Sequence, residues 1–207
     1  MKVVFSLLFV LVLTAAGFGA GAAGEDPGNP VLVRGEAFRD AGRTVDAAAC
    51  FELAMELSAG VSDQTFGLAQ QAYWGAVQQG GDFPRAYSFF SRLAEQFPDS
   101  PDVLAAKASA TGGYIGWLAQ AGLMEQVGQE RVRQLDSQAR GLYEEALAQD
   151  PASFQALFAY AIYESYSPKG AARAQALLAR LDALRDGHPD YPWAQVDRLK
   201  ARLSAAE

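Results

Sequence analysis

Hydrophobic positions between Asp82 and Pro101 recur every three or four residues, as they do along one face of a helix. In DFPRAYSFFSRLAEQFPDSP, the apolar face consists of Phe83, Ala86, Phe90, Leu93 and Phe97. Asp82 is a suitable N-cap, and Pro84 fits the first helical turn. Pro98 ends the helix because a proline forces the preceding residue out of the helical region. The stretch predicts one complete helix, then a short joint and the start of another.

The same spacing of apolar positions continues through the rest of the chain from residue 30 onward. Alanine is abundant and β-branched runs are rare beyond residue 13, which favours helices over strands. The last predicted helix carries alternating charges, as expected of a helix that closes a stack. The sequence therefore predicts an all-α protein with helices at 30–41, 44–58, 62–79, 83–97, 101–121, 131–149, 152–166, 170–186 and 191–205.

A small residue followed four positions later by an aromatic residue recurs along these helices. The pairs are Ala47 and Phe51, Ala86 and Phe90, and Ala139 and Tyr143. In the second and third copies a proline stands eight residues after the aromatic residue. A fourth copy, ARAQALLARLDAL, keeps only the small residues. The chain therefore consists of degenerate repeats, each of which contains a pair of helices.

This pattern resembles the tetratricopeptide repeat (TPR) family, in which W-x-x-L-G-x-x-Y is followed by A-x-x-x-F and then P over about 34 residues. The first copy matches this pattern at Gly35, Phe38, Gly42, Ala47, Phe51 and Ala54. The resemblance implies a TPR-like α-solenoid of antiparallel helix pairs, with about four helical hairpins plus a C-terminal capping helix. It also implies that the first helices of the pairs line a concave groove that binds a peptide.

The chain departs from the TPR pattern in two respects. Phe51 and Phe90 are 39 residues apart and Phe90 and Tyr143 are 53 apart, so we expect insertions, the largest around 121–133. In addition, Trp74 and Val127 occupy positions where the family has a small residue. Gly112, Gly113 and Gly116 form a further irregularity, for which we consider either close helix packing or a functional role as a kink or a ligand-facing wall.

The small residues have a physical role that does not depend on the family. Two helices approach closely only where short side chains allow their backbones to meet, and neighbouring aromatic rings then fill the space at interior density. We predict that the crossings are formed by Gly35, Ala47, Ala54, Ala86, Ala139 and Ala146.

The N-terminal sequence MKVVFSLLFVLVLTAAGFGAGAAGEDP is typical of a signal peptide, with one Lys, an apolar core and small residues before the cleavage point. We expect a signal peptide at 1–23, a flexible spacer at 24–29 and the repeat domain at 30–207. The alternative is an uncleaved anchor, although the apolar core is short for a span of about 20 residues. No lipoprotein cysteine is present. We therefore expect a periplasmic protein without a membrane span after cleavage.

Charge and chemistry narrow the range of functions. The formal net charge is −7 and no basic stripe is present, so we expect no nucleic-acid partner. Cys50 and His188 are the only residues of their types, and no Ser/His/Asp set, metal-ligand cluster or phosphate-binding loop occurs. Glu144 and Glu145 are adjacent on a helix and therefore diverge. We expect no enzymatic activity, no cofactor and no metal.

The candidate binding residues lie on the predicted first helices, where aromatic and amide groups suit contact with a peptide or small ligand. These residues are Gln71, Trp74, Gln78, Tyr114, Trp117 and Phe158. The lysine and asparagine clamp that some TPR grooves use for a C-terminal carboxylate is absent. The leading hypothesis is a scaffold that binds a protein or peptide in the cell envelope, and a homo-oligomer is compatible with it. The alternative is an accessory protein of a tripartite solute transporter that contacts a substrate-binding protein or a small apolar ligand.

Overall fold

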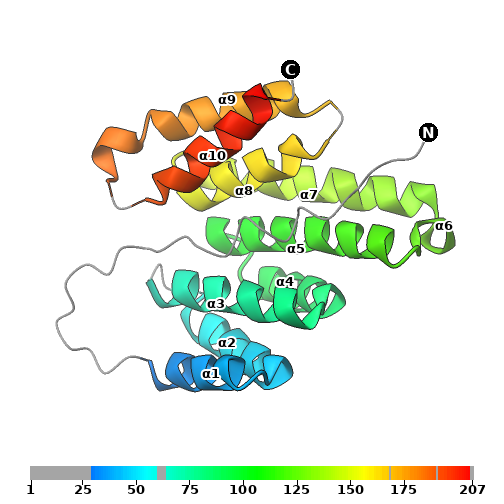
Figure 1. The fold of residues 1–207 in the computed structure, drawn as a ribbon, viewed down its shortest axis with the longest axis vertical. Helices are drawn as coiled ribbons and strands as arrows, with labels where there is room; N and C mark the ends of the chain where they lie inside the picture. The colour runs from blue at the N-terminus through cyan, green and yellow to red at the C-terminus, as the bar shows by residue number, and fades with distance from the viewer. Residues whose placement is uncertain (1–28, 60–63, 168, 190, 206–207) are drawn as a thin grey trace.

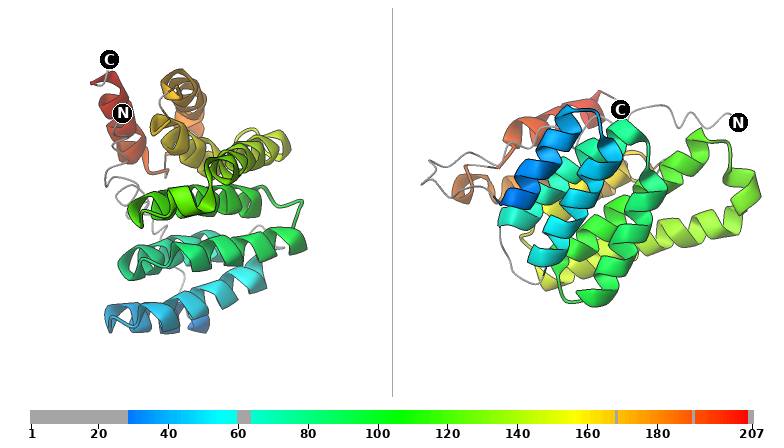
Figure 2. Two further views of the ribbon diagram at one scale, coloured as in Figure 1. Left: turned by 90° about the vertical axis from the view of Figure 1, so that its right-hand side faces the viewer. Right: turned by 90° about the horizontal axis from the view of Figure 1, so that it is seen from below.

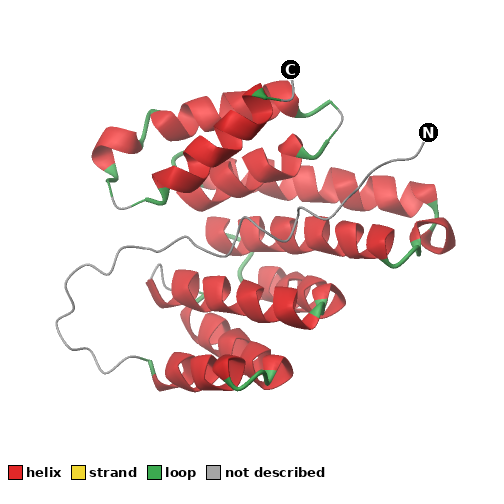
Figure 3. Cartoon of the chain, viewed as in Figure 1, coloured by secondary structure: helices red, strands yellow, loops and turns green. Residues whose placement is uncertain are grey.

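The structure, a computed structural model, describes residues 29–59, 64–167, 169–189 and 191–205. These residues form α-helices and one 3-10 turn, with no strand among them (Figures 1 and 3). The helices are α1 (Pro30–Asp40), α2 (Thr44–Ser58), α3 (Gln64–Gly80), α4 (Phe83–Gln96), α5 (Pro101–Gln120), α6 (Met124–Val127), α7 (Gln129–Gln149), α8 (Phe154–Ser165), α9 (Ala171–Asp182) and α10 (Trp193–Ser204). The all-α prediction is confirmed. The predicted signal peptide and all but Asn29 of the predicted spacer lie outside the described residues.

The helices pack as neighbouring pairs that are stacked along the molecule (Figures 1 and 2). The closest contacts join α1 with α2, α2 with α3, α4 with α5, α5 with α7, and α8 with α9, whereas the backbones of α3 and α4 approach each other at few points; α10 packs against α8 and α9 at the C-terminal end. This arrangement has the four helical hairpins and the terminal helix expected from the sequence, and it is compatible with an α-solenoid. None of the described helices combines the length and the apolar character that crossing a membrane requires.

Local signals set most of the helix boundaries. The Asp82 carboxylate accepts a hydrogen bond from the Arg85 amide at 3.3 Å, so it caps α4 as expected. Gly42 and Gly81 turn the chain between paired helices with φ values of 72° and 68°, a region that favours glycine. The prediction was too long at the C-terminal end, where α9 stops at Asp182 and a 3-10 turn follows at Arg185–Gly187. Helix α10 begins at Trp193, directly after Pro192, because proline is tolerated at the start of a helix but not in its interior.

Small residues form the helix crossings, as predicted. Ala47, Ala54, Ala86, Ala139 and Ala146 are all 0% exposed. At the α1–α2 crossing, Gly35 lies directly against the ring of Phe51, and no space for a side chain remains. The spacing of small residues along the sequence therefore identified the points where the backbones meet.

The second hairpin is the exception, because a large residue occupies its crossing. Trp74 is only 3% exposed and stacks on Phe90, with ring centroids 5.7 Å apart. Tyr73 packs edge-on against the same Phe90 ring. As a result α3 and α4 approach closely at few points, whereas the other paired helices are in close contact.

Helix α5 separates two apolar cores and is buried through most of its length. Its Val103, Ala106 and Ala110 face the core of the N-terminal half, and Leu104, Ala105 and Ala108 face the core of the C-terminal half. Of the three glycines in this helix, Gly112 and Gly113 are buried, and Gly113 abuts the ring of Phe83, which supports close packing rather than a kink. The predicted insertion lengthens α5 and α7 and places the short α6 between them (Figure 1).

Candidate functional site

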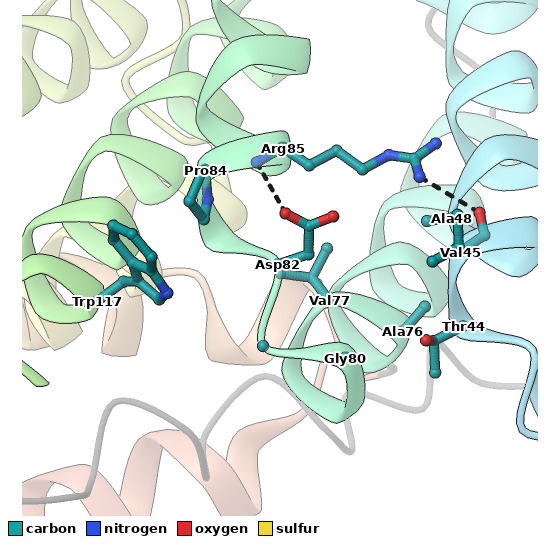
Figure 4. Close-up of a pocket in the computed structure, with 11 residues that line it drawn as sticks. Thr44, Val45, Ala48, Ala76, Val77, Gly80, Asp82, Pro84, Arg85 and Trp117 are labelled. Carbon is teal, nitrogen blue, oxygen red and sulfur yellow. Dashed lines mark hydrogen bonds between the residues drawn. The ribbon is translucent and has the colours of Figure 1, made fainter. Parts of the chain in front are cut away.

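A hollow of about 220 Å³ lies where α2, α3, α4 and α5 meet, and we call it the α2–α5 hollow (Figure 4). Its walls come from the first turn of α2, the end of α3, the first turn of α4 and one aromatic residue of α5. The lining residues are Thr44, Val45, Ala48, Ala76, Val77, Gly80, Gly81, Asp82, Pro84, Arg85 and Trp117. Figure 4 shows Trp117 on the opposite side of the hollow from Thr44 and Val45. The hollow exists because alanine and glycine occupy the end of α3, where larger side chains would fill it.

A stack of three aromatic rings leads to this hollow, and we call it the aromatic stack. The rings of Tyr87 and Tyr114 are 4.9 Å apart at 14°, and those of Tyr114 and Trp117 are 5.9 Å apart at 13°. All three side chains are partly exposed. Tyr114 and Trp117 lie three residues apart on α5 and therefore share one face of that helix, while Tyr87 extends the stack from α4. The arrangement presents flat apolar surface on rigid elements.

Arg85 at the edge of the hollow is fixed by a hydrogen-bonded network. Its guanidinium donates to both carboxylate oxygens of Glu52, from Nε at 2.8 Å and from Nη2 at 2.9 Å. The Tyr73 hydroxyl donates to the same carboxylate at 3.0 Å. The hydrogen bond to Glu52 raises the pKa of Arg85, and burial raises the pKa of Tyr73. The bidentate pair joins α2 to α4, and the Tyr73 hydrogen bond adds α3, so the network holds the walls of the hollow in place.

The structure separates the six candidate residues into two groups. Gln71, Gln78, Tyr114 and Trp117 are partly exposed, and the last two belong to the aromatic stack. Trp74 and Phe158 are 3% and 5% exposed and pack in the two cores, so in this conformation their side chains are structural. A large aromatic residue at a helix crossing and one on a partly exposed face have the same local pattern in the sequence. Only the packing of neighbouring hairpins distinguishes them.

The sequence did not point to three residues that border the site: Tyr87 in the aromatic stack, and Pro84 and Arg85 in the hollow. All three belong to a second helix, α4, whereas the family resemblance directs attention to first helices. Of the three, only the position of Arg85 in the sequence could have indicated a special role. A cation on the first turn of a helix interacts unfavourably with the helix dipole, so an arginine there indicates a compensating interaction elsewhere.

A second hollow of about 410 Å³ lies beside the joint between α4 and α5. It is lined by Asp99, Asp102 and Asp150 together with Phe97 and Pro98 at the joint. Burial, together with the negative charge of Asp150, raises the pKa of Asp102. Three carboxylates without a cationic neighbour in the lining make this hollow acidic.

The structure also places the single histidine, the single cysteine and two of the glutamates, which are the side chains with potential chemical roles. His188 is exposed and stacks on Tyr191 at 4.6 Å. Cys50 is a free cysteine with a partly exposed side chain. Glu144 accepts hydrogen bonds from Arg173 at 2.9 Å and from Tyr160 at 3.2 Å. The most deeply buried carboxylate, Glu164, pairs with Arg140 between α7 and α8.

Comparisons with protein-family models, with curated proteins and with solved structures find no match to this chain. The resemblance to TPR proteins therefore stays a prediction from the repeat pattern, and the helix-pair architecture stands on the geometry described above.

Proposed function

We propose that this protein is a non-enzymatic, TPR-like scaffold that binds a protein or peptide partner in the periplasm. The aromatic stack is the observation that carries the proposal. Its three partly exposed rings lie beside the α2–α5 hollow and supply flat apolar area together with two phenolic hydroxyls. Aromatic side chains of this kind dominate the binding energy of many protein interfaces.

The rigidity of the surrounding helices supports the same proposal. The aromatic stack lies on α4 and α5, and α5 is buried between two cores. The Arg85–Glu52 pair fixes the opposite wall. A partner that binds here does not have to order a loop, so little of its binding energy is spent on ordering the scaffold.

The transporter-accessory alternative predicts a retained small apolar ligand. The α2–α5 hollow, at about 220 Å³, is smaller than the roughly 300–1,000 Å³ of ordinary small-molecule sites. The hollow of about 410 Å³ at the α4–α5 joint is large enough, but its three carboxylates do not suit an apolar ligand, and together these features favour the protein or peptide partner. Native mass spectrometry of the purified chain separates the two functions. A co-purified metabolite would support the alternative, and a ligand-free mass together with a captured protein would support the scaffold.

Affinity capture from envelope extract tests the site with a matched pair of tryptophan variants. Trp117→Ala shortens the aromatic stack, while Trp193→Ala removes another partly exposed tryptophan, on α10. We expect the partner to be retained by the original chain and by Trp193→Ala and to be lost by Trp117→Ala, with thermal melting as the check that both variants fold. Equal capture by all three chains would remove the aromatic stack from the site.

The proposed location has its own test. N-terminal sequencing of the protein recovered from the periplasmic fraction should begin after Ala22 or Ala23, where the small-residue rule places cleavage. A chain that keeps its apolar leader and sediments with membranes would instead support the uncleaved anchor.

A further inference from the structure

Helix α2 carries an apolar stripe on the side that faces away from the core. Val45, Ala49, Leu53 and Leu57 follow one another at steps of four residues, and we call them the α2 stripe. The three large side chains are 64%, 46% and 67% exposed, in chain order. Residues four apart lie on one helix face, and this face is opposite the buried Phe51. The stripe is therefore an exposed apolar ridge along almost the whole helix, and no other described helix covers it.

The other hairpins show that this stripe is not a general property of the repeat. When the repeats are aligned on Ala47, Ala86 and Ala139, the last three stripe positions correspond in α4 to Ser88, Arg92 and Gln96, and in α7 to Gly141, Glu145 and Gln149. All six of these residues are exposed. At these aligned, exposed positions the chain thus has polar residues or glycine in two repeats, and one alanine and two leucines in the first. Apolar patches of this kind on a protein surface mark interaction sites.

We propose that the α2 stripe is the contact surface of a homodimer, in which α2 of one copy packs antiparallel against α2 of a second copy. A two-fold axis at the level of Phe51 brings Ala49 of each copy beside Leu53 of the other, so a small side chain meets a large one at the centre. Val45 and Leu57 lie towards the two ends. Ridges formed by residues four apart interdigitate in the most common class of helix packing.

The charges around the stripe favour a second copy over a charged partner. Asp46 pairs with Arg43 at 2.8 Å, and Glu56 pairs with Arg92 at 3.5 Å. The rim therefore carries compensated ion pairs in a chain whose net charge is −7. A strongly basic partner would gain little at this rim, whereas two neutral rims meet without the repulsion that the net charge would otherwise cause.

The size of the stripe sets the strength of the expected dimer. One helix face contributes a few hundred Å² from each copy, so the total falls below the roughly 1,200 Å² at which stable interfaces begin. We therefore expect a weak, concentration-dependent dimer. Val45 also lines the smaller hollow, whereas Leu53 and Leu57 line neither hollow, so variants at the two leucines test this inference separately from the proposed partner site.

Sedimentation velocity of the full chain over about a hundredfold range of concentration tests the proposal. We expect the mass to rise from monomer to dimer, and we expect Leu53→Arg and Leu57→Gln, which copy Arg92 and Gln96, to remain monomeric. Val33→Arg is the matched control, because Val33 is 54% exposed on the face of α1 that points away from α2. A monomer throughout, or a dimer that Leu53→Arg leaves intact, would overturn the proposal.

Disulfide trapping tests the antiparallel arrangement. With Cys50 replaced by serine, chains carrying Ala49→Cys are mixed with chains carrying Leu53→Cys and oxidised. We expect the mixture to give more cross-linked dimer than either chain alone, because the two-fold axis places position 49 beside position 53 of the second copy. More cross-linking within the separate chains than in the mixture would overturn the antiparallel arrangement.

Discussion

The ring of Phe51 on α2 lies against the backbone of Gly35 on α1, and a Cβ built on Gly35 would come within 2.5 Å of the Phe51 Cε1 atom. Phe51 is fully buried and belongs to the core of the N-terminal half, so its ring has little freedom to move aside. The two residues fix how closely the first hairpin closes. Their relationship shows why the repeat needs a small residue on one helix and an aromatic residue on the other.

Replacing Gly35 with alanine should therefore destabilise the protein although alanine is the better helix former. The overlap with Phe51 should cost about 1–3 kcal/mol in the free energy of unfolding. Gly75→Ala is the control, because a Cβ at that position in α3 has no neighbour within 4 Å. We expect this control to be neutral or stabilising by up to about 1 kcal/mol. Urea unfolding of both variants makes the comparison, and equal effects would contradict it.

Ala86→Leu tests the crossing alanines in the second hairpin. Ala86 is 0% exposed on α4, and a leucine there has to displace the surrounding core. We expect a lower melting temperature, corresponding to a loss of about 1–3 kcal/mol. Ser88→Leu adds a leucine to an exposed position of the same helix and should leave the melting temperature nearly unchanged. Similar melting temperatures for the two variants would argue against the crossing.

The buried ion pair between α7 and α8 should be more sensitive than its exposed neighbour. Glu164 is 1% exposed and pairs with Arg140, whereas Glu144 is 59% exposed and pairs with Arg173. Glu164→Gln leaves Arg140 with Asp136 as its remaining carboxylate partner, and we expect a loss of about 1–3 kcal/mol because the buried side chain loses its ionic hydrogen bond to the guanidinium. Glu144→Gln should cost no more than about 1 kcal/mol. Chemical denaturation measures both, and a mild effect at Glu164 would contradict the buried pairing.

Four tyrosines predict a loss of stability at alkaline pH. Burial raises the pKa of Tyr73, Tyr143 and Tyr163, and it raises the pKa of Tyr160 to about 12. In the unfolded chain these phenols ionise near pH 10, so above that pH the unfolded state releases protons that the folded state keeps. The free energy of unfolding should therefore fall as the pH rises above about 10.

Thermal melting curves recorded between about pH 8 and pH 11 measure this loss of stability. Tyr143→Phe removes one of the four groups together with its 3.0 Å hydrogen bond to Ser109. The variant should start about 1 kcal/mol less stable at the lower pH and should lose stability less steeply above pH 10. A slope as steep as that of the original chain would show that Tyr143 does not contribute.

The sequence predicted much of the architecture because the signals that decide it are local. Asp82 and Ser100 cap helices through bonds to amides three residues away, and Gly42 and Gly81 turn the chain with a backbone conformation that glycine adopts readily. The apolar spacing set the helix faces. The late helices were less well placed, because the predicted helix at 191–205 included Pro192, which in the structure precedes the first residue of α10.

Only part of the candidate site could be predicted from the sequence. Tyr114 and Trp117 were identified by their place on a first helix, but Trp74 and Phe158, chosen on the same ground, lie in the cores. Tyr87 joins the aromatic stack from a different helix. Contacts of this kind depend on how far apart two hairpins sit, and that distance follows from the sum of all side chains packed between them.

The sequence by itself determined most of the helices and the small residues at their crossings, because each depends on neighbours within a few turns of one chain segment. The tertiary structure alone decided which aromatic rings are buried and where the α2–α5 hollow opens. It also decided that the leucines of α2 face outward while those of the cores face inward. A periodic pattern defines a helix face, but only the assembled hairpins determine whether another helix covers that face.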